Sequence, residues 1–241
     1  MSVLIVAGLG VVFVAALLGG LTGFGYNLMA MPLMLLLGMS PATAVVINLA
    51  IALITRVAVV FRLLPYVRWR RALLLTGGSI PGLFAGAWLG GSLEPDVLRV
   101  LAGVLVLVIA PLLMLRRPTP HDKPRTQYAL AGFAGGALGT STSLNGVPVA
   151  LTLSADVQDQ RSFIADLAVF FVGSNIMGLA ILLLRDGVHL GDLALLGYWL
   201  PGALVANWIG TALAERIAPG VFRVLTCVLV MAAGAATLLS A

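Results

Sequence analysis

Hydrophobic residues run through this chain in eight long stretches separated by short polar links. The stretches cover residues 3–18 continued by 28–37, 42–64, 72–89, 97–115, 128–138 continued by 147–153, 163–184, 193–213 and 221–239. The unbroken ones are close to the ~20 residues that a helix needs to cross the hydrocarbon core of a bilayer. They lack the alternation over about ten residues that marks the strands of a membrane barrel. The pattern predicts an all-α integral membrane protein.

Composition supports a lipid environment. Of the 241 residues, 61% are hydrophobic and 10% are charged, whereas soluble domains have about 45–50% and about 25%. A water-soluble domain of this size keeps a large wet exterior, and the polar residues to cover it are missing. We therefore expect the lipid bilayer to cover most of the surface.

The net charge of +5 comes from two basic links between apolar stretches. The first link holds Arg62, Arg68, Arg70 and Arg71, and the second holds Arg116, Arg117, Lys123 and Arg125. Lys and Arg concentrate in cytoplasmic loops of membrane proteins, so both links are predicted to be cytoplasmic. This distribution explains the basic character without a nucleic-acid partner, and the protein is expected in the cytoplasmic membrane.

The two halves of the chain resemble each other. Equivalent residues recur at separations of 116, 120 and 124 residues: Pro32 with Pro148, Pro81 with Pro201, and Arg99 with Arg223. The separations grow in small steps, as loop insertions between two copies would produce. We predict a first membrane repeat over 1–115, a proline-rich cytoplasmic linker over 116–127 and a second membrane repeat over 128–241.

Each predicted repeat opens with a hydrophobic segment that small and polar residues interrupt, at 19–27 and at 139–146. Gly, Ser, Thr and Asn weaken a helix through backbone freedom and competing hydrogen bonds. Backbone groups freed at membrane depth need protein or a water-filled cavity as partners. Paired broken helices in two halves indicate the binding site of a transporter.

The course of the first broken segment has two alternatives. A straight helix over 3–37 would span about 52 Å, which exceeds the ~30 Å hydrocarbon core. A crossing with an unwound middle gives parallel repeats, whereas a re-entrant hairpin inverts the second repeat. The inverted arrangement places eleven Lys and Arg residues in the cytoplasm and the parallel one nine, so inversion is favoured. Arg161 is cytoplasmic only in the inverted arrangement.

The breaks carry the candidate substrate-binding residues. The half-helices beginning near residues 28 and 147 present free N–H groups and the positive end of the helix dipole. Such amides, with nearby hydroxyls, are suited to replace the hydration shell of an oxyanion. The candidates are Thr22, Gly23, Gly25, Asn27, Ser141, Ser143, Asn145 and Gly146. The alternative is that these small residues only allow close helix packing.

Four further candidates are polar residues inside hydrophobic stretches. Arg56 is a candidate anion ligand, because a charge inside the membrane costs several kcal/mol and is usually functional. It has two alternatives, pairing with Asp166 or reaching the cytoplasmic surface. Asp166 is a candidate coupling group or charge partner, with an interfacial role as its alternative. Asn48 and Asn175 are candidate ligands that can also serve as hydrogen bonds between helices.

The motifs of both halves resemble those of the sulfite exporter (TauE/SafE) family. In the first half these are Gly-Phe-Gly at 23–25 with Pro-Leu at 32–33, and in the second half the residues at 139–148 with Phe-Phe at 170–171. Many members have a longer glycine run in place of residues 26–27 and a second proline in place of Val147. The resemblance covers nearly the whole chain. It implies a cytoplasmic-membrane carrier of small sulfur-containing anions such as sulfite, thiosulfate or sulfonates, without a prosthetic group.

Sequence and resemblance together predict a secondary anion transporter that works by alternating access. Candidate coupling ions are H⁺ and Na⁺, and a homodimer is one candidate assembly. The alternative is a non-transporting membrane scaffold or assembly protein. An enzyme or a metal site is disfavoured, because both histidines, His121 and His189, lie in polar links outside the hydrophobic stretches.

Overall fold

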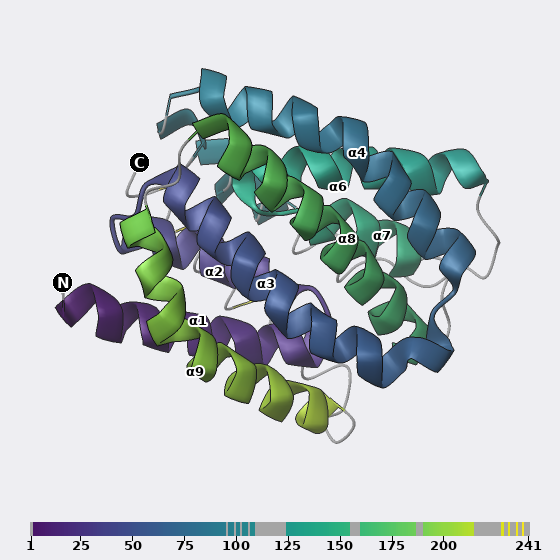
Figure 1. Cartoon of the computed structure of the whole chain (residues 1–241), viewed down its shortest axis with the longest axis horizontal. Helices are drawn as coiled ribbons and strands as arrows, with labels where there is room; N and C mark the ends of the chain where they lie inside the picture. The colour runs from purple at the N-terminus through teal and green to yellow at the C-terminus, as the bar shows by residue number, and fades with distance from the viewer. Residues whose placement is uncertain are drawn as a thin grey trace.

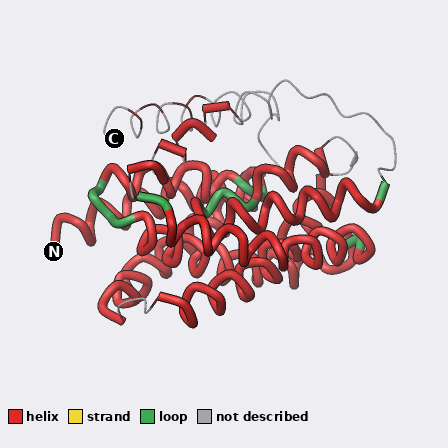
Figure 2. The backbone as a smooth tube through the Cα atoms, turned by 90° about the horizontal axis from the view of Figure 1, so that it is seen from above, coloured by secondary structure: helices red, strands yellow, loops and turns green. Residues whose placement is uncertain are grey.

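The computed structural model describes residues 2–94, 124–154, 160–186 and 190–214, most positions from 96 to 108, and positions 228, 231, 235 and 238. Every element that these residues form is a helix (Figures 1 and 2). In order they are α1 (Ser2–Thr22), α2 (Gly25–Leu36), α3 (Pro41–Leu63), the 3₁₀ helix η1 (Leu64–Tyr66), α4 (Trp69–Ser92), α6 (Arg125–Thr142), α7 (Gly146–Ser154), α8 (Gln160–Asp186) and α9 (Leu190–Ala214). The predicted last stretch, 221–239, and linker residues 116–123 lie outside the continuously described ranges.

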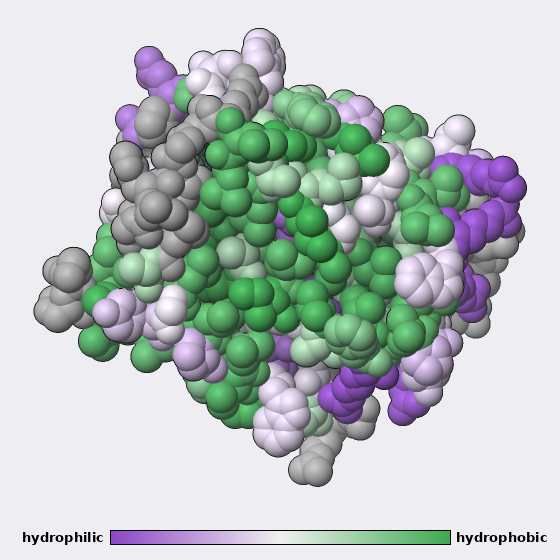
Figure 3. Space-filling view, viewed as in Figure 1, coloured by the Kyte–Doolittle hydropathy of each residue, from purple (hydrophilic) through white to green (hydrophobic). Residues whose placement is uncertain are grey.

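The helices have the length and surface of membrane spans. Within the described ranges, four are long and apolar enough to cross a bilayer: Leu4–Thr22, Pro41–Tyr66, Trp69–Ser92 and Arg161–Leu184. Large hydrophobic side chains lie on the outside, including Phe61 at 76% and Trp208 at 69% exposure. The face drawn in Figure 3 is hydrophobic over most of its area, with hydrophilic residues toward its edges. The prediction of helices that span a membrane is thus supported by length, composition and surface.

Both predicted breaks are present, and each is narrower than expected. Residues 23–24 separate α1 from α2, and residues 143–145 separate α6 from α7. The start of α2 is therefore Gly25, where we expected it near residue 28. The Oγ1 atom of Thr22 accepts hydrogen bonds from the amides of Gly25, at 2.8 Å, and Phe24, at 3.4 Å. The hydroxyl thus satisfies N–H groups that have no partner within α2. Thr22, which we expected to interrupt the helix, is the last residue of α1 and stabilises the start of α2.

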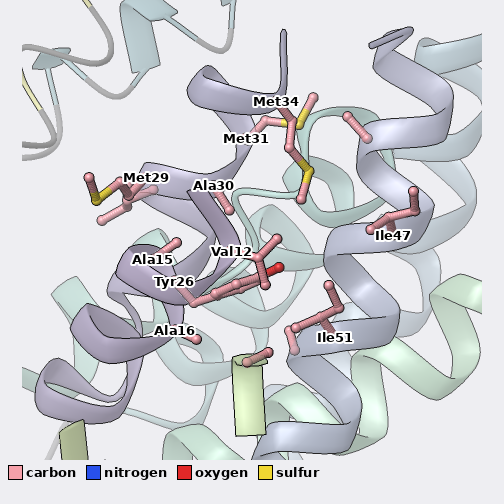
Figure 4. Packing of buried hydrophobic residues seen from close by; sticks show 14 of the residues in the cluster. Val12, Ala15, Ala16, Tyr26, Met29, Ala30, Met31, Met34, Ile47 and Ile51 are labelled. Carbon is pink, nitrogen blue, oxygen red and sulfur yellow. The ribbon is translucent and has the colours of Figure 1, made fainter. Parts of the chain in front are cut away.

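The chain reverses direction at the first break. In Figure 1, α1 leads away from the N-terminus and α2 returns toward that end of the molecule. Figure 4 shows Val12 and Ala15 of α1 in one cluster with Tyr26 and Ala30 of α2. With 12 residues, α2 spans about 18 Å and is too short to cross the ~30 Å core. This course matches the re-entrant alternative.

Helices of the two halves interleave. Helix α1 of the first half packs against α9 of the second half, and α6 of the second half packs against α4 of the first half. At the centre, α3 packs against α8. Arg161 near the start of α8 donates to Tyr66 just after α3, and Arg56 earlier in α3 lies over the ring of Phe171 further along α8. These contacts make α3 antiparallel to α8. They also place Arg161 beside the first basic link.

Glycines bring main chains into direct contact between the halves. A Cβ added at Gly82 of α4 would clash with the carbonyl oxygen of Phe133, and one at Gly136 of α6 with that of Ser79. On the opposite side, Gly210 of α9 lies equally close to the carbonyl oxygen of Leu17 in α1. Such small-residue contacts drive helix association in lipid, where burial of apolar surface contributes little.

We predict opposite effects of alanine at two glycines of α4. Gly82→Ala should lower the free energy of unfolding by about 1–3 kcal/mol, because the new methyl group overpacks the contact with Phe133. Gly77→Ala should leave stability unchanged or raise it by up to about 1 kcal/mol, because Gly77 has open space around it and alanine favours the helix. Unfolding of the purified protein in detergent measures both. Equal stability of the two variants would contradict the close α4–α6 contact.

Candidate functional site

Three buried asparagines connect the two breaks. The Nδ2 atom of Asn27, at the start of α2, donates to Oδ1 of Asn145 at 3.0 Å. Asn145 lies directly before α7, and its own Nδ2 donates to Oδ1 of Asn175 on α8 at 2.7 Å, with Ser174 Oγ at 3.4 Å. All four residues are buried. The structure therefore brings together three of the predicted site residues from three different helices and loops, and it links the two halves through them.

Arg56 is fully enclosed in protein. Its side chain is 2% exposed, Nη2 donates to the carbonyl oxygen of Gly19 at 2.9 Å, and Cζ lies 5.7 Å from the ring centroid of Phe171. The sequence left two alternatives to anion binding for Arg56, namely reaching the cytoplasmic surface and pairing with Asp166. Among the described residues the side chain does neither. A buried cation without a counterion is costly. The arrangement therefore favours the interpretation of Arg56 as an anion ligand.

Several buried polar atoms around the breaks lack a hydrogen-bond partner within the described part of the chain. They are Arg56 Nη1, Asn27 Oδ1, Ser143 Oγ and Asn175 Nδ2. Each such atom costs about 1–3 kcal/mol when it stays unpaired. Since folded proteins leave few of these groups unsatisfied, a cluster of them indicates a place that a ligand or water completes.

Comparison with known proteins identifies a family. The family model of the sulfite exporter TauE/SafE matches residues 8–237. The chain belongs to the sulfite exporter TauE/SafE family. No curated protein and no solved structure matches it. The matched region includes both breaks, Arg56 and all three asparagines, and it identifies the chain as a membrane transport protein, as the motifs predicted.

Asp166 has a different environment from the rest of the predicted site. In this TauE/SafE protein its carboxylate is buried, and Oδ1 accepts the backbone N–H of Arg68 at 2.7 Å. Arg68 directly precedes α4, and a carboxylate is stabilising at a helix N-terminus. The contact fastens α8 to the link between α3 and α4. This geometry favours the interfacial alternative for Asp166.

Among the other residues of the predicted site, those at the breaks hydrogen-bond within or next to their own helices, and Asn48 lies apart from the breaks. The hydroxyls of Thr22 and Ser141 donate to carbonyl oxygens one turn earlier in their own helices. Gly25 gives its N–H to Thr22. Asn48 is buried on α3, where Nδ2 lies 3.7 Å from the sulfur of Met31, and it has no hydrogen bond to the three asparagines.

Each of the two breaks contains one residue whose backbone is in the left-handed region. Gly23 has φ of +84° and Ser143 has φ of +62°. Glycine adopts this conformation freely, whereas it costs a serine about 1–2 kcal/mol. Strain of this kind persists where the surrounding structure imposes it, often at functional sites. Together with its unpaired hydroxyl, this makes Ser143 a stronger candidate ligand than Ser141.

Two residues that contact Arg56, Gly19 and Phe171, were not among the site residues predicted from the sequence. The carbonyl of Gly19 belongs to a helix that we expected to end before it, and only the glycine-rich stretch signalled its position. Phe171 was part of the family motif, but an aromatic residue in a hydrophobic helix carries no signal of a polar contact. Gly146, which was predicted, lies beside this ring: a Cβ there would be 2.5 Å from Cζ of Phe171.

We predict that the asparagine network stabilises the fold through Asn145. Asn145→Leu leaves Asn27 Nδ2 and Asn175 Oδ1 without their partners, and each stranded group costs about 1–3 kcal/mol. Asn48→Leu is the matched control, because it removes a buried asparagine whose Oδ1 is already unpaired and should be neutral or stabilising. Thermal unfolding of both variants measures the difference. A loss for Asn48→Leu as large as that for Asn145→Leu would count against the network.

Proposed function

We propose that this protein is a secondary transporter that moves small sulfur-containing anions across the cytoplasmic membrane by alternating access. The observation that carries the proposal is the buried Arg56, whose Nη1 has no partner in the described structure. An oxyanion placed there would neutralise the charge and form a charge-assisted hydrogen bond, which is about twice as strong as a neutral one. Membership of the TauE/SafE family supports this choice of substrate class.

The start of α7 supplies the second element of the proposed site. The helix begins at Gly146, and the first turn of a helix presents N–H groups that lack helical partners and attract anions. The ring of Phe171 contacts both Gly146 and Arg56, so the helix start and the guanidinium lie on one aromatic side chain. Asn175 Nδ2 and Ser143 Oγ add two nearby groups that can donate to an oxyanion.

We further propose that residues 1–115 and 128–241 are two inverted copies, and that their relative motion exposes the site to either side. Three observations support inversion. The contacts of α1 with α9 and of α6 with α4 form a matched set. Helix α3 runs antiparallel to α8, and Arg161 lies at Tyr66, beside the basic link that we predict to be cytoplasmic. Inverted repeats with broken helices at their interface are a common transporter design.

Loss of the buried arginine should lower anion flux at least about tenfold when the anion concentration is below saturation. Arg56→Gln removes the charge from the proposed site, and a hydrogen bond to a charged group contributes about 1.5–3 kcal/mol, which corresponds to at least about a tenfold loss in anion affinity. Arg62→Gln is the matched control, because Arg62 is exposed at the end of the same helix. Flux of ³⁵S-labelled sulfite and thiosulfate in proteoliposomes measures the effect.

If the Arg56→Gln variant transports the anion at the wild-type rate, Arg56 is not part of the anion site. The scaffold alternative makes a different prediction, since it expects no change in the unfolding temperature of the wild-type protein with any anion. A thermal-shift panel of sulfite, thiosulfate, sulfonates and carboxylates at two pH values distinguishes the two functions.

Cysteine labelling tests the inverted arrangement. The only cysteine of the sequence, Cys227, is first replaced by alanine. In this background we expect Tyr66→Cys and Arg161→Cys to react with a membrane-impermeant maleimide only from the cytoplasmic side. Ser40→Cys, in the exposed link before α3, should react only from the outside, because one membrane span separates it from Tyr66. Reaction of Arg161→Cys from the outside would support parallel repeats.

A further inference from the structure

One face of α4 points out of the bundle along the length of the helix. Helix α4 lies at an edge of the bundle and packs with its other side against α6 and α8 (Figure 1). The outward side chains are large and apolar and recur at the spacing of one helix face. They include Leu73 at 61% and Phe84 at 58% exposure, with Ile80 between them. An exposed apolar face of this length marks a contact with lipid or with another protein.

Two tryptophans mark the level of the bilayer on this face. Trp69 and Trp88 are both exposed, and at 1.5 Å per residue they lie about 28 Å apart along the helix. This separation matches the ~30 Å hydrocarbon core, and tryptophan favours the boundary between the core and the headgroups. Trp69 is therefore at headgroup level on the side of the first basic link, and Leu73 and Phe84 are at the level of the acyl chains.

The charged residues beside Trp69 are arginines. Residues 61–73 contain four arginines and no acidic residue. Arg68 and Arg70 are exposed, and Arg70 belongs to the outward face of α4, because helix positions 70, 73 and 77 lie on one side. A guanidinium group is well suited to bind phosphate. This end of the face therefore fits the phosphate of a lipid headgroup.

Further along the same face there is an indentation at Gly77. A Cβ at this position would have no atom within 4 Å, whereas Leu73 and Phe84 on either side carry large exposed side chains. The missing side chain leaves room for a hydrocarbon chain against the main chain of α4. Gly77 lies about 10 Å from Arg70 along the helix, which is less than half the thickness of the hydrocarbon core. An acyl chain of a lipid whose phosphate is at Arg70 would pass it.

We propose that this face binds an anionic phospholipid, with the phosphate at Arg68 and Arg70 and one acyl chain in the indentation at Gly77. Basic residues near the membrane surface attract anionic lipids, whereas the cationic group of a zwitterionic lipid opposes this attraction. A second copy of the chain fits the face less well, because a symmetric contact places the same patch of both copies together and the arginines would repel each other. The lipid site is separate from the buried anion site and does not depend on it.

Native mass spectrometry of the purified full chain in detergent tests the headgroup contact. Titration with dioleoylphosphatidylglycerol and dioleoylphosphatidylcholine compares two lipids that have equal chains and different charge. We expect phosphatidylglycerol to bind at least about fivefold more tightly, and Arg70→Gln to lower its affinity about fivefold, which is the contribution of one arginine near the membrane surface. Arg125→Gln is the matched control and should leave the affinity unchanged, because Arg125 is an exposed arginine at the start of a different helix, α6.

A second pair of variants tests the acyl-chain contact. Gly77→Leu fills the indentation and should weaken the binding of phosphatidylglycerol by about fivefold or more, because the added side chain overpacks the contact. Gly10→Leu is the matched control and should have no effect. Gly10 is also a helical glycine whose Cβ would have no atom within 4 Å, but it lies on α1.

Four outcomes would overturn the lipid site. The first is equal affinity of the wild-type protein for the two lipids. The second is a loss for Arg125→Gln as large as that for Arg70→Gln, and the third is a loss for Gly10→Leu as large as that for Gly77→Leu. The fourth is a lipid-free dimer in the same spectra that Gly77→Leu dissociates, which would assign the face to a second copy of the chain.

Discussion

The structure depends on one electrostatic constraint, a positive charge held deep inside the protein with no carboxylate beside it among the residues that the structure describes. Arg56 lies on α3, the helix that packs centrally against α8, and its described partners are a carbonyl oxygen and an aromatic ring. Neither partner carries a full negative charge. A folded protein tolerates such a cation only where other interactions compensate for its desolvation, and the anion that we propose as the substrate would supply that compensation.

Close helix contacts make this arrangement possible. Between α4 and α6, and between α1 and α9, glycines remove the side chains that would hold the main chains apart. The contact at Gly19 illustrates the consequence for the site, since a Cβ there would lie 2.7 Å from Cβ of Tyr26 and 3.0 Å from Nη2 of Arg56. The absent side chain allows the guanidinium to reach the carbonyl of α1. Small residues thus position the charge as well as associate the helices.

The breaks explain why each half needs the other. Asn27 follows one break and Asn145 precedes the helix after the other, and each amide satisfies part of its partner. A single broken helix would leave these groups unpaired in an apolar medium, at a cost of about 1–3 kcal/mol each. Pairing them across the halves lowers that cost and retains a few free donors and acceptors at the junction. The polar junction is therefore a property of the assembled bundle.

The sequence alone determined the features that are local. Hydrophobic length located the helices, Gly, Ser and Asn located the two breaks, and an arginine inside a hydrophobic stretch was recognised because its cost in lipid does not depend on its neighbours. The exact end of the first break was missed because the hydroxyl of Thr22, which we expected to disrupt the helix, accepts the N–H of Gly25 at the start of α2.

Only the tertiary structure decided the partners: the carbonyl of Gly19 and the ring of Phe171 for Arg56, and the N–H of Arg68 for Asp166. These contacts join residues far apart in the chain. They follow from the direction and register of packed helices, which hydrophobic periodicity leaves undetermined.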